Sequence, residues 1–178
     1  MFCMARRARR SRRALTGAAG RRISGTMQRT GFVMTRAATI EAEEAAILEE
    51  FSFFDDPREV IEHIVELGRE LPAMDDAQKT EANRVRGCQS QVWMVAGFDE
   101  AKRRMTLEAD SDAVIVKGLI SLVLRLYDGR PPAEVAQAGE AVFEKIGLGK
   151  MLTPGRQNGL YAMLARVRQM AQALTSVA

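Results

Sequence analysis

The sequence predicts a mixed protein of helices and short strands, preceded by a basic N-terminal segment. Apolar residues recur at helical spacing before residue 70 and after residue 112. Residues 104–109 instead alternate apolar and polar side chains, the period of two that a half-buried strand shows. The 178 residues are enough for one domain with a hydrophobic core. No apolar run is long enough to cross a bilayer, so we expect no membrane association.

Charge is divided unevenly along the chain. Residues 1–36 hold ten arginines and no acidic residue, although the whole chain carries a net charge of only +3. Residues 37–178 therefore contain the other 16 lysines and arginines and all 23 aspartates and glutamates, which gives them a net charge of −7. Nucleic-acid recognition needs a basic face, so this balance argues against nucleic acid as a partner of the body, residues 39–178.

Residues 1–38 form a basic segment without sustained apolar periodicity, and we expect it to be disordered. Three interpretations of it are open: an arm that binds RNA or DNA, an organelle-targeting peptide, or upstream sequence translated from a start site placed too early. We favour the third, because Met27 and Met34 offer later start sites. A secretory signal is not expected, since no adequate apolar region follows the arginines.

The first part of the body predicts two amphipathic helices. Residues 40–54 place their apolar side chains on one face and their glutamates on the other. A second helix begins at Asp56-Pro57, an N-cap followed by proline, and ends near Gly68. The only histidine, His63, lies beside its apolar stripe and is interpreted as a packing or surface residue. One histidine and one cysteine cannot build a zinc or iron–sulfur cage, so we expect no metal site.

The middle of the body predicts a loop and three short strands. Residues 73–83 are polar and loop-like, and strands are expected at 85–87, 91–98 and 104–109. The turn at 99–102 is short enough to join the last two strands as an antiparallel hairpin.

The C-terminal half predicts helices only. Asp110-Ser111-Asp112 offers an N-cap for a buried central helix over residues 113–127. Shorter helices are expected at 133–138 and 141–146, and Thr153-Pro154 begins a last long helix. The central helix has one polar line with a spacing of four residues: Lys117, Ser121 and Arg125.

Cys88 lies in unusual surroundings for a structural cysteine, which normally hides among apolar side chains. It is flanked by Gly87 and by the polar residues Gln89 and Ser90, where a loop enters a strand. The other cysteine, Cys3, lies in the basic segment, so we expect no disulfide and interpret the body as a reduced, cytoplasmic protein. From the residues alone, two interpretations remain: a reactive, sulfur-handling thiol, or an inert thiol that caps a strand.

Several segments together resemble the SufE family of cysteine-desulfuration proteins. They are Gly87–Trp93, Ala109–Ile120, Leu152–Pro154 with Arg156 and Gly159, and Ile64–Gly68 with Leu71-Pro72. The resemblance covers about residues 40–174, in the family's order and spacing. It implies an α+β fold in which a small three-stranded antiparallel sheet packs against several helices, as in SufE- and IscU-like proteins. The basic segment departs from the pattern, because the family does not usually carry one.

The resemblance also implies a function. Cys88 would accept persulfide sulfur from a SufS-type cysteine desulfurase, activate that enzyme, and pass the sulfur to a SufB-type scaffold for iron–sulfur cluster assembly. The body itself would hold no cofactor, because the pyridoxal phosphate belongs to the partner, and it would carry out no independent reaction. A homodimer is compatible with the family. The other site residues would support the loop or contact the partner: Gly87, Gln89, Ser90, Asp112 and Arg156.

Sulfur transfer requires Cys88 to attack as a thiolate, whereas a free thiol with a pKa of about 8.5 is mostly protonated at neutral pH. Partner contacts or loop amides must therefore favour the anion at the moment of attack. Two other classes of function stay open. One is an adaptor that activates a desulfurase by binding alone, with the thiol incidental; the other is nucleic-acid binding through the basic segment.

Overall fold

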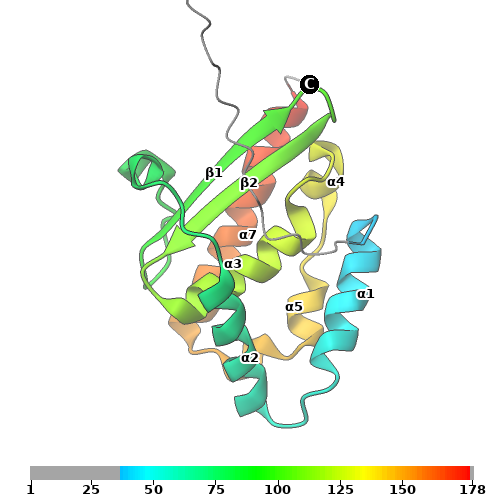
Figure 1. Cartoon of the computed structure of the whole chain (residues 1–178), viewed down its shortest axis with the longest axis vertical. Helices are drawn as coiled ribbons and strands as arrows, with labels where there is room; N and C mark the ends of the chain where they lie inside the picture. Colours follow the sequence, from blue (N-terminus) through cyan, green and yellow to red (C-terminus); the bar gives the residue numbers. More distant parts are fainter. Residues whose placement is uncertain (1–36, 177–178) are drawn as a thin grey trace, which may run out of the picture. The chain divides into compact units, whose positions relative to one another are not determined.

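The computed structural model describes residues 37–176 (Figure 1). Of the basic segment, residues 1–38, positions 1–36 lie outside the described part of the chain, so its three interpretations stay predictions. Hydrogen bonds attach Ala37 and Ala38 to the rest of the described chain. The Ala37 N–H donates a hydrogen bond to Glu43 Oε2 at 2.8 Å, and Arg130 Nη1 donates one to the Ala38 carbonyl at 2.7 Å.

The described residues form a mixed α+β fold. In chain order the elements are α1 (Ile40–Phe51), α2 (Pro57–Glu70), the 3-10 helices η1 (Asp76–Gln78) and η2 (Glu81–Asn83), β1 (Val92–Asp99), β2 (Arg104–Ser111), α3 (Val114–Tyr127), α4 (Pro132–Gln137), α5 (Ala141–Lys145), α6 (Leu148–Met151) and α7 (Pro154–Thr175). None of these helices is long and apolar enough to cross a membrane.

The predicted hairpin is present, but the expected three-stranded sheet is not. β1 and β2 pair antiparallel from Val92↔Ser111 to Asp99↔Arg104, and they form a two-stranded sheet within residues 37–176. Residues 85–87 do not form the third strand. Only one isolated bridge, Arg84↔Trp93, precedes a turn at residues 86–87, because the chain leaves the sheet edge there to form the next loop.

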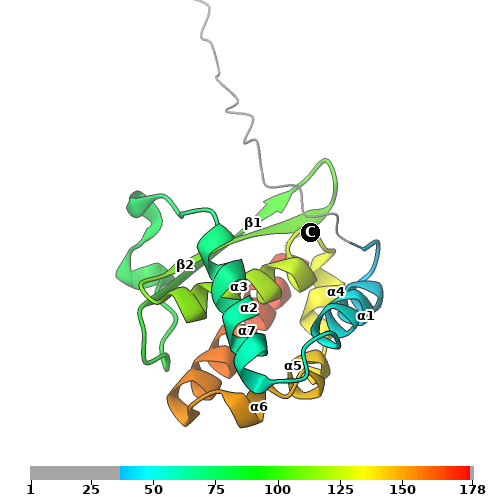
Figure 2. The same cartoon turned by 60° about the horizontal axis from the view of Figure 1, so that its bottom comes forward.

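The core is organised around α3. This helix contacts α1, α2, α7 and β2, and most of its side chains are buried. Figures 1 and 2 show the hairpin crossing α3 and α7, while α1 lies beside α5. The alternating apolar side chains of both strands point into this core, which explains why Met94 and Met105 are fully buried.

Two glycines let α2 and α3 touch through their backbones. A Cβ on Gly118 would overlap the Ile64 carbonyl, and one on Gly68 would overlap the Val114 carbonyl. Gly68 was expected to end α2, but the helix continues to Glu70. The role of this glycine is therefore close packing between helices rather than helix termination.

Each side chain on the polar line of α3 finds a partner on another element. Lys117 Nζ lies 2.9 Å from Asp110 Oδ1, and Ser121 Oγ donates a hydrogen bond to the Leu67 carbonyl at 3.0 Å. Arg125 pairs with two carboxylates of α1, Glu43 at 3.0 Å and Glu50 at 2.7 Å. A buried charge without a partner is costly, so these pairs make the polar line compatible with the core.

His63 is a packing residue, as expected. Its Nε2 lies 2.6 Å from Glu50 Oε1, and its ring packs against the rings of Phe51 and Phe54 at centroid distances of 5.3 and 4.9 Å.

The predicted helix caps are only partly correct. Asp56 caps α2 as expected, accepting a hydrogen bond from the Arg58 N–H at 2.8 Å. The expected Asp110–Asp112 cap of α3 is wrong: the N-cap is Ala113, which makes no side-chain cap bond. Asp112 is instead used by a neighbouring loop, as described next.

Candidate functional site

Cys88 lies on a short loop, residues 86–91, that we call the cysteine loop. Its first end follows the single bridge to β1, where the Val85 N–H donates a hydrogen bond to the Val92 carbonyl at 2.8 Å. At its other end, the Gln91 N–H donates to Asp112 Oδ1 at 3.0 Å, and Ser111 Oγ donates to the Gln91 carbonyl at 2.7 Å. Backbone and side-chain hydrogen bonds therefore hold both ends of the loop against the hairpin.

Gly87 begins the turn with a φ of +92°. A Cβ added there would lie 3.6 Å from Ala162 Cβ, an ordinary contact, so space alone does not demand glycine. The positive φ does, because a Cβ clashes with the backbone in that conformation. Gly87 therefore supports the loop through its backbone conformation.

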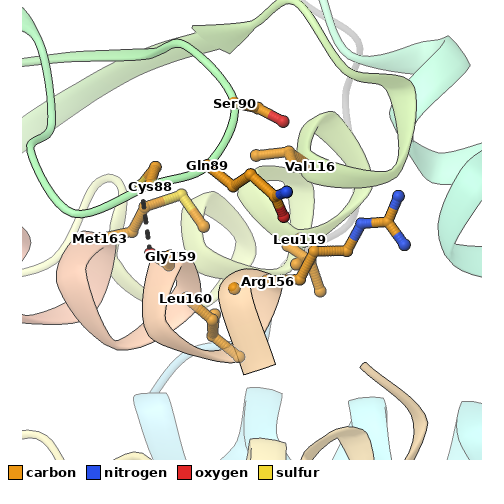
Figure 3. Close-up of a pocket in the computed structure, with 10 residues that line it drawn as sticks. Cys88, Gln89, Ser90, Val116, Leu119, Arg156, Gly159, Leu160 and Met163 are labelled. Carbon is orange, nitrogen blue, oxygen red and sulfur yellow. Dashed lines mark hydrogen bonds between the residues drawn. The ribbon is translucent and has the colours of Figure 1, made fainter. Parts of the chain in front are cut away.

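The half-buried side chain of Cys88 lies in a small pocket between the loop and two helices (Figure 3). The volume of this pocket is about 10 Å³, which is room for about one small group. Its lining residues come from the cysteine loop, α3 and α7: Cys88, Gln89, Ser90, Val116, Leu119, Gly155, Arg156, Gly159, Leu160 and Met163.

The surroundings of the Cys88 thiol favour its neutral form. Cys88 Sγ donates a hydrogen bond to the Gly159 carbonyl at 3.5 Å, and a carbonyl acceptor stabilises S–H rather than the anion. Burial also raises the pKa of the Cys88 thiol above its usual value. This environment disfavours the thiolate, which is the form in which a cysteine attacks.

Three of the expected supporting residues line the pocket: Gln89, Ser90 and Arg156. Figure 3 shows the Arg156 guanidinium directed away from Cys88, so only the stem of this exposed side chain lines the pocket. Gln89 lies over the first turn of α7, where a Cβ on Gly155 would come within 2.7 Å of its Oε1. Ser90 also lines the pocket, whereas Asp112 lies outside the lining and holds the end of the loop.

Sequence reasoning found only part of the helical wall of the site. Arg156 and Gly159 were named, whereas Gly155, Leu160 and Met163 were not. One signal was available: Gly155 and Gly159 lie one turn apart at the start of a long helix, where glycine weakens the helix. Such a pair indicates that another segment packs closely on that turn.

No group of three or more His, Cys, Asp or Glu side chains within residues 37–176 is placed to hold a metal ion. The carboxylates near the cysteine loop are instead occupied by protein donors, as with Asp112 and the Gln91 N–H.

Comparisons with known proteins agree with this architecture. A solved structure, the solution structure of a hypothetical protein from Thermus thermophilus, matches with a TM-score of 0.62 and 21% sequence identity. The match covers 75% of this chain and 96% of that one, and at this identity it shows the fold alone.

Closer relatives share more of the sequence. An uncharacterized SufE-like protein of Rhizobium etli is 40% identical over 129 residues, covering 71% of this chain and 87% of the relative. A second one, from Rhizobium meliloti, is 37% identical over 129 residues, covering 71% of this chain and 92% of the relative. The family model described as "SufE: Fe-S metabolism associated domain" matches residues 45–171. The chain therefore belongs to the SufE family, whose domain is associated with iron–sulfur metabolism.

Proposed function

We propose that this protein is a sulfur acceptor and carrier that works with a SufS-type cysteine desulfurase. Cys88 takes sulfur from the partner's cysteine persulfide, activates the desulfurase by removing that sulfur, and passes it to a SufB-type scaffold. The observation that supports this most is the placement of the thiol. It lies on a loop held at both ends, inside a pocket with room for about one small group.

The transfer step is a thiol exchange at sulfur. The Cys88 thiolate attacks the outer sulfur of the partner's persulfide, forming a new S–S bond as the partner's own S–S bond breaks. The partner's cysteine leaves as a thiolate and takes up the proton that Cys88 has lost. Sulfur moves between two cysteines without any net oxidation, so the step needs no further oxidant or reductant.

The pocket suits a carrier better than a permanent catalyst. A persulfide is easily oxidised, and the apolar side chains of Val116, Leu119 and Leu160 would shield its outer sulfur from solvent. The same burial disfavours the thiolate, so the loop must leave the pocket for each transfer. The carrier would alternate between a closed loop that stores sulfur and an open loop that exchanges it.

The chemistry that releases sulfur from cysteine would belong to the desulfurase, which holds the pyridoxal phosphate. Arg156, exposed at the mouth of the pocket, is placed to contact that partner when the loop opens. The cytoplasm, where the cysteine stays reduced, is the compartment that this chemistry requires.

The test is intact-mass measurement after incubation with a SufS-type desulfurase and cysteine. We expect one added sulfur on Cys88, together with faster sulfide release by the desulfurase. Cys88→Ser should abolish both effects, whereas Cys3→Ser, the matched control, should change neither. Full stimulation by Cys88→Ser would contradict the carrier mechanism and support an adaptor that activates the desulfurase by binding alone.

A further inference from the structure

Asp110 is a buried carboxylate at the end of β2 with four hydrogen-bonding neighbours. Its side chain is only 3% exposed. Oδ1 lies 2.9 Å from Lys117 Nζ and accepts a hydrogen bond from the Ser111 N–H at 2.8 Å. Oδ2 lies 3.0 Å from Lys79 Nζ and accepts a bond from the Met74 N–H at 3.4 Å.

These partners connect Asp110 to the segments that surround Cys88. Lys79 and Met74 belong to residues 74–85, the stem that leads into the cysteine loop. Lys117 belongs to α3, next to Val116 in the wall of the pocket. One carboxylate therefore links the stem of the loop to the helix against which the loop closes.

The residues that follow Asp110 hold the other end of the loop. Ser111 and Asp112 bind the carbonyl and the N–H of Gln91. A displacement of the β2 end would therefore move the Gln91 end of the cysteine loop directly. No pocket-lining atom belongs to Asp110 itself, so its influence on Cys88 is indirect.

We propose that Asp110 is a positioning residue for Cys88, acting through its ion pairs with Lys79 and Lys117 to keep the cysteine loop closed over its pocket. This inference rests on the proposed function for its biological meaning, but not for its test. Charge is essential to it, because the amide of an asparagine has one acceptor oxygen, which can keep the bond from the Ser111 N–H, but no negative charge with which to pair either lysine. Lys79 would then keep only Asp76 of its own segment, at 2.8 Å, and the ionic link between the stem and α3 would be lost.

The test measures the rate at which iodoacetamide alkylates Cys88 in a Cys3→Ser background. Asp110→Asn should raise the rate about fivefold, which corresponds to about 1 kcal/mol in the balance between closed and open loop. Lys79→Met should also raise the rate. It removes a charge at a partly exposed position, so we expect the fold to stay intact. Lys79→Arg should restore a rate near that of the parent protein.

Two controls separate loop positioning from general destabilisation. Lys102→Met breaks a more exposed ion pair, Lys102–Asp99 at 3.2 Å on the hairpin, and should leave the rate unchanged. Val135→Ala removes buried volume from α4, away from the pocket lining, and should lower stability without raising the rate.

Three results would overturn the proposal: folded Asp110→Asn with an unchanged rate, Lys79→Met no faster than Lys102→Met, or Lys79→Arg as fast as Lys79→Met. If Asp110→Asn does not fold, the two Lys79 variants decide alone. Alkylation needs no desulfurase, so failure of the sulfur-carrier proposal would show in the mass measurement and leave this result standing.

Discussion

The Cys88 thiol donates a hydrogen bond to the backbone carbonyl of Gly159, one turn into α7. The sulfur lies 3.5 Å from the carbonyl oxygen. Since a carbonyl oxygen is only an acceptor, this contact favours the neutral thiol over the thiolate. Glycine at position 159 leaves the sulfur in contact with bare backbone, because a Cβ there would itself lie 3.5 Å from Sγ. The surroundings of Cys88 therefore disfavour the thiolate.

We expect the pKa of Cys88 to be higher in the native protein than in the unfolded chain. Burial raises the pKa of the Cys88 thiol, so alkylation by iodoacetamide should reach half its maximal rate at a higher pH in buffer than in denaturant. In denaturant the midpoint should lie at about 8.5, the value of a free cysteine. The measurement uses the Cys3→Ser background. A native midpoint at or below the denatured one would contradict a closed loop.

Gly87→Ala should destabilise the cysteine loop through its backbone. The positive φ of +92° penalises any side chain, by about 1–2 kcal/mol, although the added methyl would meet only Ala162 at an ordinary distance. The variant should therefore open the loop more often and expose Cys88 to alkylation. Gly139→Ala is the matched control, because its Cβ would meet nothing within 4 Å. Equal alkylation rates in both variants would show that the conformation of Gly87 does not hold the loop closed.

Gly118→Ala should lower the free energy of unfolding by about 3 kcal/mol. A methyl group there would overlap the Ile64 carbonyl, and a backbone atom can move away only if α2 and α3 separate. Urea unfolding followed by circular dichroism measures the loss. Gly149→Ala, a helical glycine with open space around it, should stay close to the parent stability. A tolerated Gly118→Ala would mean that the two helices pack less closely than the structure shows.

Tyr127 should make stability fall at alkaline pH. Burial raises the pKa of Tyr127 to about 12 in the folded protein, against about 10 in the unfolded chain. The folded state holds the phenol proton more tightly, so this contribution is complete below pH 10 and is lost as the pH rises toward 12. Urea unfolding at several pH values across that interval measures the loss.

Tyr127→Phe should reduce that alkaline loss and cost about 1 kcal/mol at neutral pH, because the hydrogen bond to the Gly139 carbonyl at 2.8 Å disappears. Tyr161→Phe is the control, since Tyr161 is 39% exposed and should affect neither quantity. Parallel pH profiles for Tyr127→Phe and the parent protein would refute a role for the buried phenol.

Local sequence patterns were sufficient to predict several elements. Alternating side chains identified the hairpin, and the Asp56-Pro57 pair identified the start of α2. Both patterns depend only on residues that are close together in the sequence. The third strand was wrong for a reason that short patterns do not show. The turn at Arg86-Gly87 takes the chain away from the sheet edge after one bridge.

Residue types at set spacings were enough to identify the family, to single out Cys88 and to find the line of polar residues on α3. The partners of those residues depend instead on how distant segments pack together. The Gly159 carbonyl lies 71 positions from Cys88, and Arg125 finds Glu43 across 82 positions. Likewise, Asp112 was predicted to cap its own helix but binds Gln91 across 21 positions. Such contacts arise from how whole elements pack against one another, so the pocket that protects Cys88 exists only once α3, α7 and the loop have assembled.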